Sequence, residues 1–224
     1  SPGTEGMIAS FGKANMIEKA RKQPEKVKEV INKISTDGLI ETYEAVKQKI
    51  EEPIPLGYSN VGEIIDIGED VKGFKIGDRV ASNGPHAEIF SVNQNLCAVI
   101  PDNVRNEDAV FTVIASIGLN GIRLSKPSFG ETFLVSGLGL IGLITSQILI
   151  SNGCTVLGVD PDEDRCNLAS SFGVESLNIS RNNDQVSWCL KKTQNLGIDG
   201  AIITAAVDSS DPINYAAKSC RKRG

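Results

Sequence analysis

Three glycines and an aspartate have the spacing of a dinucleotide-binding site. Gly137, Gly139 and Gly142 form a G-x-G-x-x-G motif after one apolar run, and a second apolar run ends at Asp160. Such glycines allow a tight turn, close approach of the backbone to a pyrophosphate, and close packing of helix on strand. The start of the following helix favours phosphate. The expected cofactor loop comprises Gly137, Leu138, Gly139, Leu140, Ile141 and Gly142.

The residues after the second apolar run bear on which dinucleotide is bound. The Asp160 carboxylate can accept hydrogen bonds from an adenosine ribose and would repel a phosphate on that ribose, which favours NAD over NADP. Arg165 is an alternative partner for such a phosphate, so NADP stays possible, although an arginine on a solvated helix face is the simpler interpretation. The glycines alone would also suit helix packing in another α/β domain.

From residue 131 onward, apolar runs and helical patterns alternate with short loops, which is typical of a doubly wound parallel sheet. Strands are expected at 132–136, 155–160, 176–179 and 198–204, and helices at 140–151, 163–172, 184–194 and 211–220. Six strands are usual in such a sheet. We therefore expect the fourth strand to lie at an edge, and the chain to be a C-terminally truncated portion of a longer protein.

The N-terminal half has a different pattern. Apolar residues at helical spacing within 13–52 predict an amphipathic helical hairpin. Short β-branched runs at 61–68, 79–81 and 87–92 predict strands of a small curved β-domain, and 107–124 is expected to be helical. We place the domain boundary between residues 106 and 107.

Composition excludes several classes of protein. The net charge of −5, with both signs mixed along the chain, argues against a nucleic-acid or anionic membrane partner. No apolar run reaches the roughly 20 residues of a membrane helix. The five scattered cysteines suit reduced thiols in a cytoplasmic protein. Because the chain begins at Ser1, we expect its natural N-terminus to be missing.

Three further motifs resemble the medium-chain dehydrogenase/reductase superfamily, which contains the zinc-type alcohol dehydrogenases and their zinc-free relatives. The segment 57–68 matches the family's G-H-E-x-x-G-x(5)-G spacing at each glycine, 71–80 resembles V-x-x-F-x-x-G-D-R-V, and 3–5 resembles the end of C-G-T-D. The resemblance implies a GroES-like catalytic domain beside the Rossmann domain, a small-molecule substrate and a homodimer. It also implies that the nicotinamide ribose passes Thr204 and Ala205, although small residues there are equally consistent with plain packing of helix on strand.

The family's zinc ligands are replaced in this chain. Pro2, Tyr58 and Ala115 stand where a zinc enzyme carries Cys, His and Cys, and the four-cysteine structural lobe is absent from the sequence. A catalytic zinc needs about three N, S or O ligands, so no metal is expected. The single histidine, His86, is interpreted as structural rather than catalytic.

Without zinc, another group must assist proton transfer. The family's G-T/S-D element supplies a hydroxyl to a proton relay, which makes Thr4 the best-matched candidate, although turn capping would equally explain it. Tyr58 has a phenolic hydroxyl to donate to the substrate oxygen, or it simply fills the vacated metal pocket.

The helical insertion resembles a bacterial branch of two-part oxidoreductases of polysaccharide and sugar metabolism, which implies a sugar-type alcohol or ketone as substrate. We therefore expect a zinc-independent NAD(H)-dependent oxidoreductase that transfers hydride between nicotinamide and an alcohol or carbonyl carbon. Two alternatives remain open. One is an NADPH-dependent quinone or enoyl reductase, and the other is a dinucleotide-binding module without catalysis.

Overall fold

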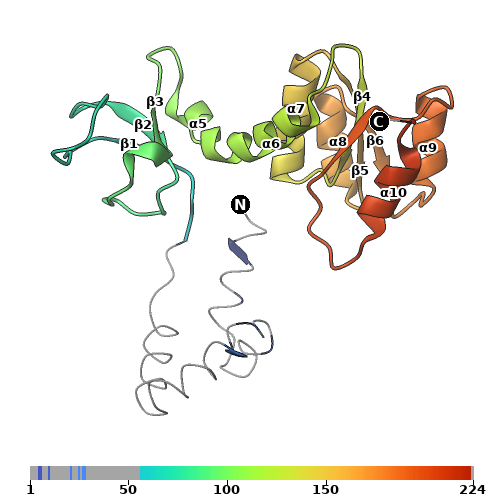
Figure 1. Cartoon of the computed structure of the whole chain (residues 1–224), viewed down its shortest axis with the longest axis horizontal. Helices are drawn as coiled ribbons and strands as arrows, with labels where there is room; N and C mark the ends of the chain where they lie inside the picture. The colour runs from blue at the N-terminus through green and yellow to red at the C-terminus, as the bar shows by residue number, and fades with distance from the viewer. Residues whose placement is uncertain are drawn as a thin grey trace. The chain divides into compact units, whose positions relative to one another are not determined.

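The computed structural model describes residues 56–222 and seven earlier residues: Glu5, Gly6, Ser10, Arg21, Glu25, Val27 and Lys28. It separates into two compact units, Ser1–Ile100 and Pro101–Gly224 (Figure 1). Most of the expected helical hairpin, 13–52, lies outside the described residues, and the four described positions within it are helical. The domain boundary between 106 and 107 remains a prediction.

The first unit contains a small antiparallel sheet. Its strands are β1 (Asn60–Glu63), β2 (Arg79–Ser82) and β3 (Cys97–Val99), in the order β1-β2-β3. The 3-10 helix η1 (Gln94–Leu96) leads directly into β3. Val80 and Ala81 in the central strand are buried, since β2 has a partner on each side.

Two strand predictions in this unit differ from the structure. Residues 87–92 form no strand, and Ile89 within them is 71% exposed. The strand expected over 61–68 ends at Glu63. The short strand β3 pairs with β2 instead, and nothing in its sequence distinguished it. Alternation of apolar residues marks a half-buried face, but a strand also requires a neighbouring strand to pair with.

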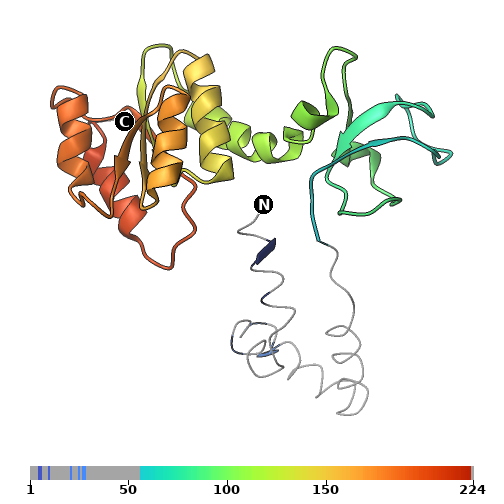
Figure 2. The ribbon, with the colours of Figure 1, turned by 180° about the vertical axis from the view of Figure 1, so that it is seen from behind.

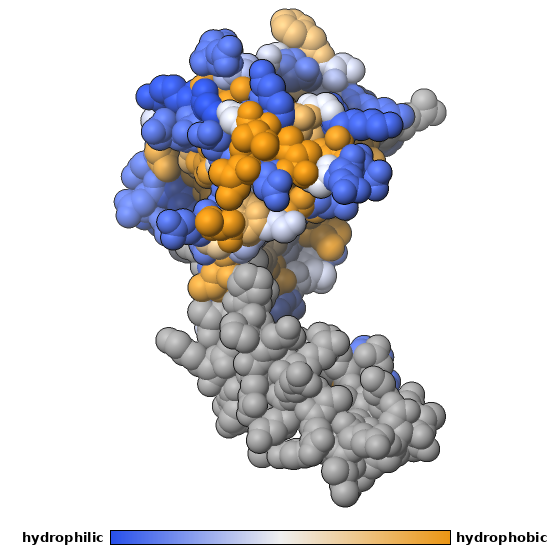
Figure 3. Space-filling view, turned by 90° about the vertical axis from the view of Figure 1, so that its left-hand side faces the viewer, coloured by the Kyte–Doolittle hydropathy of each residue, from blue (hydrophilic) through white to orange (hydrophobic). Residues whose placement is uncertain are grey.

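Large apolar side chains of the first unit reach solvent. Figure 3 shows hydrophobic residues gathered among hydrophilic ones on this side of the molecule. The exposed large apolar residues of the unit are Leu56, Ile65, Ile76, Ile89, Leu96 and Val99. The three-stranded sheet therefore leaves apolar surface uncovered by the described residues.

The second unit is a four-stranded parallel sheet with helices on both faces. Its strands are β4 (Thr132–Ser136), β5 (Thr155–Asp160), β6 (Glu175–Asn178) and β7 (Gly200–Ile203). The order is β6-β5-β4-β7. The chain adds β5 and β6 on one side of β4 and then crosses back to place β7 on the other side of β4. The helices are α5 (Asn106–Ala109), α6 (Thr112–Ser125), α7 (Leu140–Ser151), α8 (Glu163–Ser171), α9 (Gln185–Lys192) and α10 (Asp211–Ser219).

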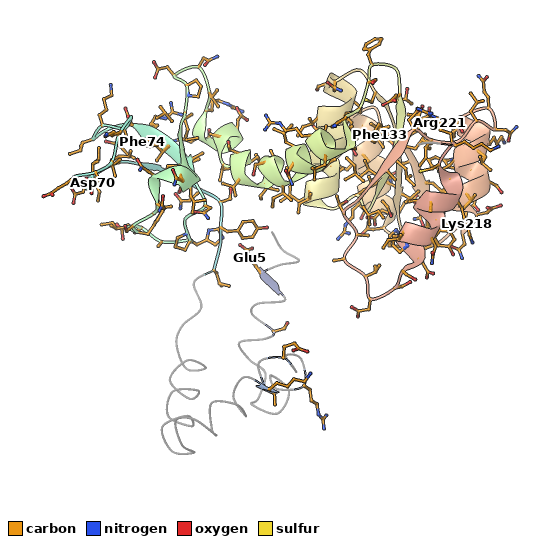
Figure 4. The ribbon with its side chains drawn as sticks, viewed as in Figure 1. Glu5, Asp70, Phe74, Phe133, Lys218 and Arg221 are labelled. Carbon is orange, nitrogen blue, oxygen red and sulfur yellow. The ribbon has the colours of Figure 1, made fainter. Side chains whose placement is uncertain are left out.

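Alternate residues of the central strand build a core on each face of this sheet. Phe133 and Val135 of β4 pack with residues of α6, α7 and α8, including Leu149, whereas Leu134 packs with Cys189 of α9 and Ala216 of α10. Figures 1 and 2 show α7 and α8 on one side of the sheet and α9 and α10 on the other, and Figure 4 labels Phe133. Because both faces are covered, β4 is apolar at consecutive positions rather than alternate ones.

The α/β class and the parallel sheet are confirmed, with β7 at an edge as the usual strand order implies. All four predicted strands and their four following helices are present, with ends shifted by a few residues. The helix expected over 107–124 is instead two helices, α5 and α6. At the break between them, the Thr112 hydroxyl donates to the Ala109 carbonyl at 2.6 Å. In an uninterrupted helix this carbonyl would accept a backbone N–H instead.

Candidate cofactor-binding site

The glycine turn lies between the end of β4 and the start of α7. Gly137 has a φ of +97°, and a Cβ there would lie 2.7 Å from the backbone nitrogen of Ala205. A Cβ on Gly142 would overlap the carbonyl oxygen of Gly137. The chain itself therefore requires glycine at these two positions, one for the turn and one for the approach of the helix.

Gly139 differs from the other two glycines of the motif. Its φ is −70°, and a Cβ built on it would have no atom within 4 Å among the described residues. Gly139 is the N-cap of α7, supplies no side-chain cap, and is followed by a first turn without acidic residues. The structure thus leaves open space beside a helix N-terminus, where backbone N–H groups and the helix dipole favour an anion.

Asp160 ends β5 with its carboxylate directed at the glycine turn. Its Oδ2 accepts the backbone N–H of Leu138 at 2.7 Å, and its Oδ1 accepts the N–H of Asp162 at 2.9 Å. Only 2% of Asp160 is exposed. The carboxylate therefore fixes the loop it faces, a role that the sequence motif did not reveal, in addition to any contact with a ribose.

Arg165 lies beside this carboxylate on the first turns of α8. Its Nη1 is 3.7 Å from Asp160 Oδ2, and its Nε is 3.8 Å from Asp162 Oδ2. The side chain is 53% exposed, so both ion pairs are loose and partly hydrated. Asp160, whose carboxylate would favour NAD, and Arg165, whose guanidinium would favour NADP, thus lie side by side.

Thr204 and Ala205 lie against the glycine turn, immediately after β7. The Thr204 hydroxyl donates to the Gly137 carbonyl at 2.6 Å, and the Ala205 N–H donates to the Ser136 carbonyl at 2.9 Å. The ends of β4, β5 and β7 thus converge at one edge of the sheet, at its topological switch point. Ligands bind at such points in open α/β sheets.

The predicted catalytic residues belong to the first unit. Thr4 and Pro2 lie outside the described residues. Tyr58 is half-buried, and the preceding Gly57 has a φ of +86°. The imidazole of His86 packs on Gly57, and its Nε2 lies 2.9 Å from Oε1 of Glu5. Sequence reasoning missed this contact because the two residues are 81 positions apart.

Two of the positions that the family resemblance assigns to zinc ligands lie among the described residues. Tyr58 and Ser59 stand in the G-H-E element, and Ala115 lies within α6. Among the described residues, no cluster of three or more His, Cys, Asp or Glu side chains has the arrangement of a metal site.

One known family model matches part of this chain. The model of the alcohol dehydrogenase GroES-like domain matches residues 29–137, a range that ends at Gly137, the first glycine of the turn described above. The chain therefore contains an alcohol dehydrogenase GroES-like domain.

Curated proteins that resemble this chain include proteins named as sugar and alcohol dehydrogenases. D-guloside 3-dehydrogenase of Escherichia coli (strain K12) is 35% identical over 124 residues, which cover 54% of this chain and 35% of that protein. (R,R)-butanediol dehydrogenase of Bacillus subtilis (strain 168) is 25% identical over 183 residues, covering 69% and 53%. The chain thus spans about a third of the first relative's length and about half of the second's.

Solved structures show the same fold. The 2R,3R-butanediol dehydrogenase from Bacillus subtilis aligns with a TM-score of 0.65 and 23% identity, covering 77% of this chain and 57% of that one. In the described part of the chain, no helix has both the length and the apolar character needed to cross a bilayer.

Proposed function

We propose that this chain is part of a zinc-independent, NAD(H)-dependent oxidoreductase that acts on an alcohol or carbonyl carbon of a sugar-like substrate. The open space at Gly139 carries the proposal. Gly137 and Gly142 are explained by packing within the chain, but Gly139 is not, so its missing side chain is best explained by a ligand.

The residues present fit a dinucleotide. The N-terminus of α7 would hold the pyrophosphate, with Leu140 and Ile141 in its first turn, and Asp160 would face the adenosine ribose. Thr204 and Ala205 would flank the path to the nicotinamide, where small side chains permit close approach. The bound nicotinamide supplies hydride transfer. The protein's own part is to fix these contacts and to move a proton.

Sugar-type substrates are supported by the relatives. The curated protein that is 35% identical over 124 residues is named for a dehydrogenation of a D-guloside. Zinc independence is supported by residue types, since Tyr58 and Ala115 stand at ligand positions and neither side chain is a usual zinc ligand.

A second function is favoured by Arg165. A guanidinium beside Asp160 would pair with the ribose phosphate of NADPH. The quinone oxidoreductase of Escherichia coli, whose structure holds NADPH, aligns with a TM-score of 0.64 at 21% identity, covering 77% of this chain and 56% of that one. That identity establishes the fold alone. An NADPH-dependent quinone or enoyl reductase is therefore the alternative.

The test is a fluorescence titration of the protein with NADH and with NADPH, followed by turnover assays. D-sorbitol, (R,R)-2,3-butanediol and a methyl D-guloside would probe the main proposal, and 1,4-benzoquinone the alternative. Tighter binding of NADH and oxidation of an alcohol probe are expected. Tighter binding of NADPH with reduction of the quinone would replace the main proposal by the alternative.

Arg165→Ala separates the two cofactor assignments. If Arg165 is only a surface partner of Asp160 and Asp162, the variant leaves NADH affinity within about twofold of the original, because exposed ion pairs contribute little. If Arg165 binds a ribose phosphate, NADPH affinity falls about tenfold or more and NADH affinity does not. Binding of neither nucleotide by the unmodified protein would reject both functions.

A further inference from the structure

Two loops of the second unit, at the sheet edge where Asp160 lies, are joined by side chains that the proposed cofactor contacts do not include. One loop follows β5 and leads through Pro161 into α8, and the other follows β6 and spans residues 179–184. The strands β5 and β6 are neighbours (Figure 1), and Asp160 at the end of β5 is paired in register with Asn178 at the end of β6. The loop after β6 therefore starts beside the residue whose carboxylate would face the adenosine ribose.

Glu163, the first residue of α8, connects these two loops. Its Oε2 accepts a hydrogen bond from Asn178 Nδ2 at 2.5 Å, and its Oε1 accepts one from Arg181 Nη1 at 3.1 Å. The Glu163 side chain is 39% exposed and that of Arg181 is 72% exposed. The hydrogen bond with the half-buried Asn178 is therefore better shielded from water than the ion pair with Arg181.

The amide group of Asn178 is engaged at both ends. While its Nδ2 donates to Glu163, its Oδ1 accepts the backbone N–H of Ser180 at 2.9 Å and that of Arg181 at 3.3 Å. An asparagine that accepts from the backbone N–H two residues further on fixes a turn in the chain. By holding the amide of Asn178, Glu163 thus also fixes the path of the loop that follows β6.

Two further hydrogen bonds join the same loops independently of Glu163. The Ile179 N–H donates to the Asp160 carbonyl at 3.1 Å, and the Ser180 hydroxyl donates to the Pro161 carbonyl at 3.1 Å. These bonds hold the start of the loop after β6. Removal of the Glu163 carboxylate would therefore leave this loop attached at its start and release the Asn178 amide and the Arg181 guanidinium.

We propose that Glu163 is a positioning residue for the adenosine half of the bound dinucleotide. This inference rests on the proposed cofactor function and adds a residue that acts through the loop after β6 without touching the nucleotide. Ligands of open parallel sheets bind beyond the carboxyl ends of the strands, which is where both loops lie. A loop that is already held in one arrangement loses less conformational entropy when a ligand binds, so the affinity is higher.

Competition with the two halves of the cofactor tests this role. AMP and nicotinamide mononucleotide are used as competitors in a fluorescence titration with NADH. Glu163→Ala is expected to weaken binding of NADH and of AMP by about tenfold each and to leave nicotinamide mononucleotide unaffected. Glu163→Gln keeps an oxygen that accepts from Asn178, so it is expected to weaken AMP binding by less than about threefold.

Glu175→Ala is the matched control. Glu175 is the first residue of β6, at the opposite end of this strand from Asn178, and its Oε2 lies 2.5 Å from Nζ of Lys192. Its side chain is 48% exposed, so the substitution removes a comparably exposed ion pair away from the proposed site. Binding of NADH and of AMP is expected to stay within about twofold of the unmodified protein.

Hydrogen exchange in the unmodified protein provides a second measurement that does not depend on whether a variant folds. AMP is expected to slow exchange of the backbone N–H groups of residues 179–182, and nicotinamide mononucleotide is expected to leave them unchanged.

Three results would overturn the role of Glu163 while the cofactor site stands. They are AMP binding by Glu163→Ala within about twofold of the unmodified protein, an equal loss for both halves of the cofactor, and exchange in this loop that AMP does not alter. If the unmodified protein binds neither NADH nor NADPH, the proposed function fails, and this inference fails with it.

Discussion

The backbone N–H of Leu138 donates to the carboxylate of Asp160 at 2.7 Å, which ties the glycine turn after β4 to the end of β5. The acid is thus held in place by the loop that it helps to shape. This arrangement joins two motif elements that are 22 residues apart in sequence. It means that substitutions of Asp160 act on the loop as well as on a bound ribose.

Asp160→Ala is expected to lower both stability and NADH affinity. Removing the carboxylate leaves the N–H of Leu138 without its partner in a buried site, which costs about 1–3 kcal/mol. Chemical denaturation and nucleotide titration measure the two effects. Asp160→Asn is the informative companion, since its amide oxygen can still accept from Leu138. If Asp160→Asn keeps stability and also keeps the full preference for NADH, the carboxylate does not select the cofactor.

Gly139→Ala and Gly142→Ala form a matched pair within the same turn. Gly139→Ala meets open space, so the free energy of unfolding is expected to change by less than about 1 kcal/mol while NADH affinity falls about tenfold. Gly142→Ala forces the new methyl group into the Gly137 carbonyl and is expected to lower the thermal midpoint markedly. A stable Gly139→Ala variant that binds NADH normally would remove the main support for the cofactor site.

Gly57→Ala tests whether the His86 imidazole packs on Gly57 in the first unit. The substitution is disfavoured twice, by a φ of +86° and by the ring atom 2.5 Å from the new Cβ. We expect a loss of more than about 1 kcal/mol in the free energy of unfolding. In the histidine NMR spectrum, the imidazole signals should shift because the ring has moved. Unaltered signals in a folded variant would show that the ring does not pack on Gly57 in solution.

Cys189 is expected to resist alkylation in the folded protein. It is fully buried, and burial raises the pKa of its thiol from 9.0 to about 11. Between about pH 9 and 11 the thiol is protonated in the folded protein but ionised in the unfolded chain. The contribution of Cys189 to the stability of the folded state is therefore complete below about pH 9 and is lost as the pH rises through about 11.

Iodoacetamide at pH 8 followed by peptide mass spectrometry provides the measurement. The half-buried Cys97 serves as the internal comparison, and unfolding in guanidinium should make both residues reactive. Labelling of Cys189 at the rate of Cys97 under native conditions would contradict its burial.

The sequence predicted the second unit well because its signals are local. Phe133, Val135 and Leu134 lie in one continuous apolar run that is buried on both faces, and glycines mark the turn that follows. Strand order also follows from the family's usual topology.

The first unit was harder to predict because its structure depends on distant partners. Strand β3 has only three residues and is defined by its pairing with β2, and the apolar pattern around Ile89 has no such partner. The contact between Glu5 and His86 depends on the tertiary fold alone. The carboxylate partner of His86 was therefore not foreseen, and the interpretation of His86 as structural stays a prediction.

The outer edge of β7 has a practical consequence for handling the protein. Ile198, just before β7, forms an isolated parallel bridge with Cys220, which occupies the first part of this edge. Beyond it, within residues 56–222, no strand covers the side of β7 that faces away from β4. An open edge of this kind is a template for strand addition, so concentrated samples of this chain should aggregate through it, and a lysine at the exposed Ile203 should slow that aggregation.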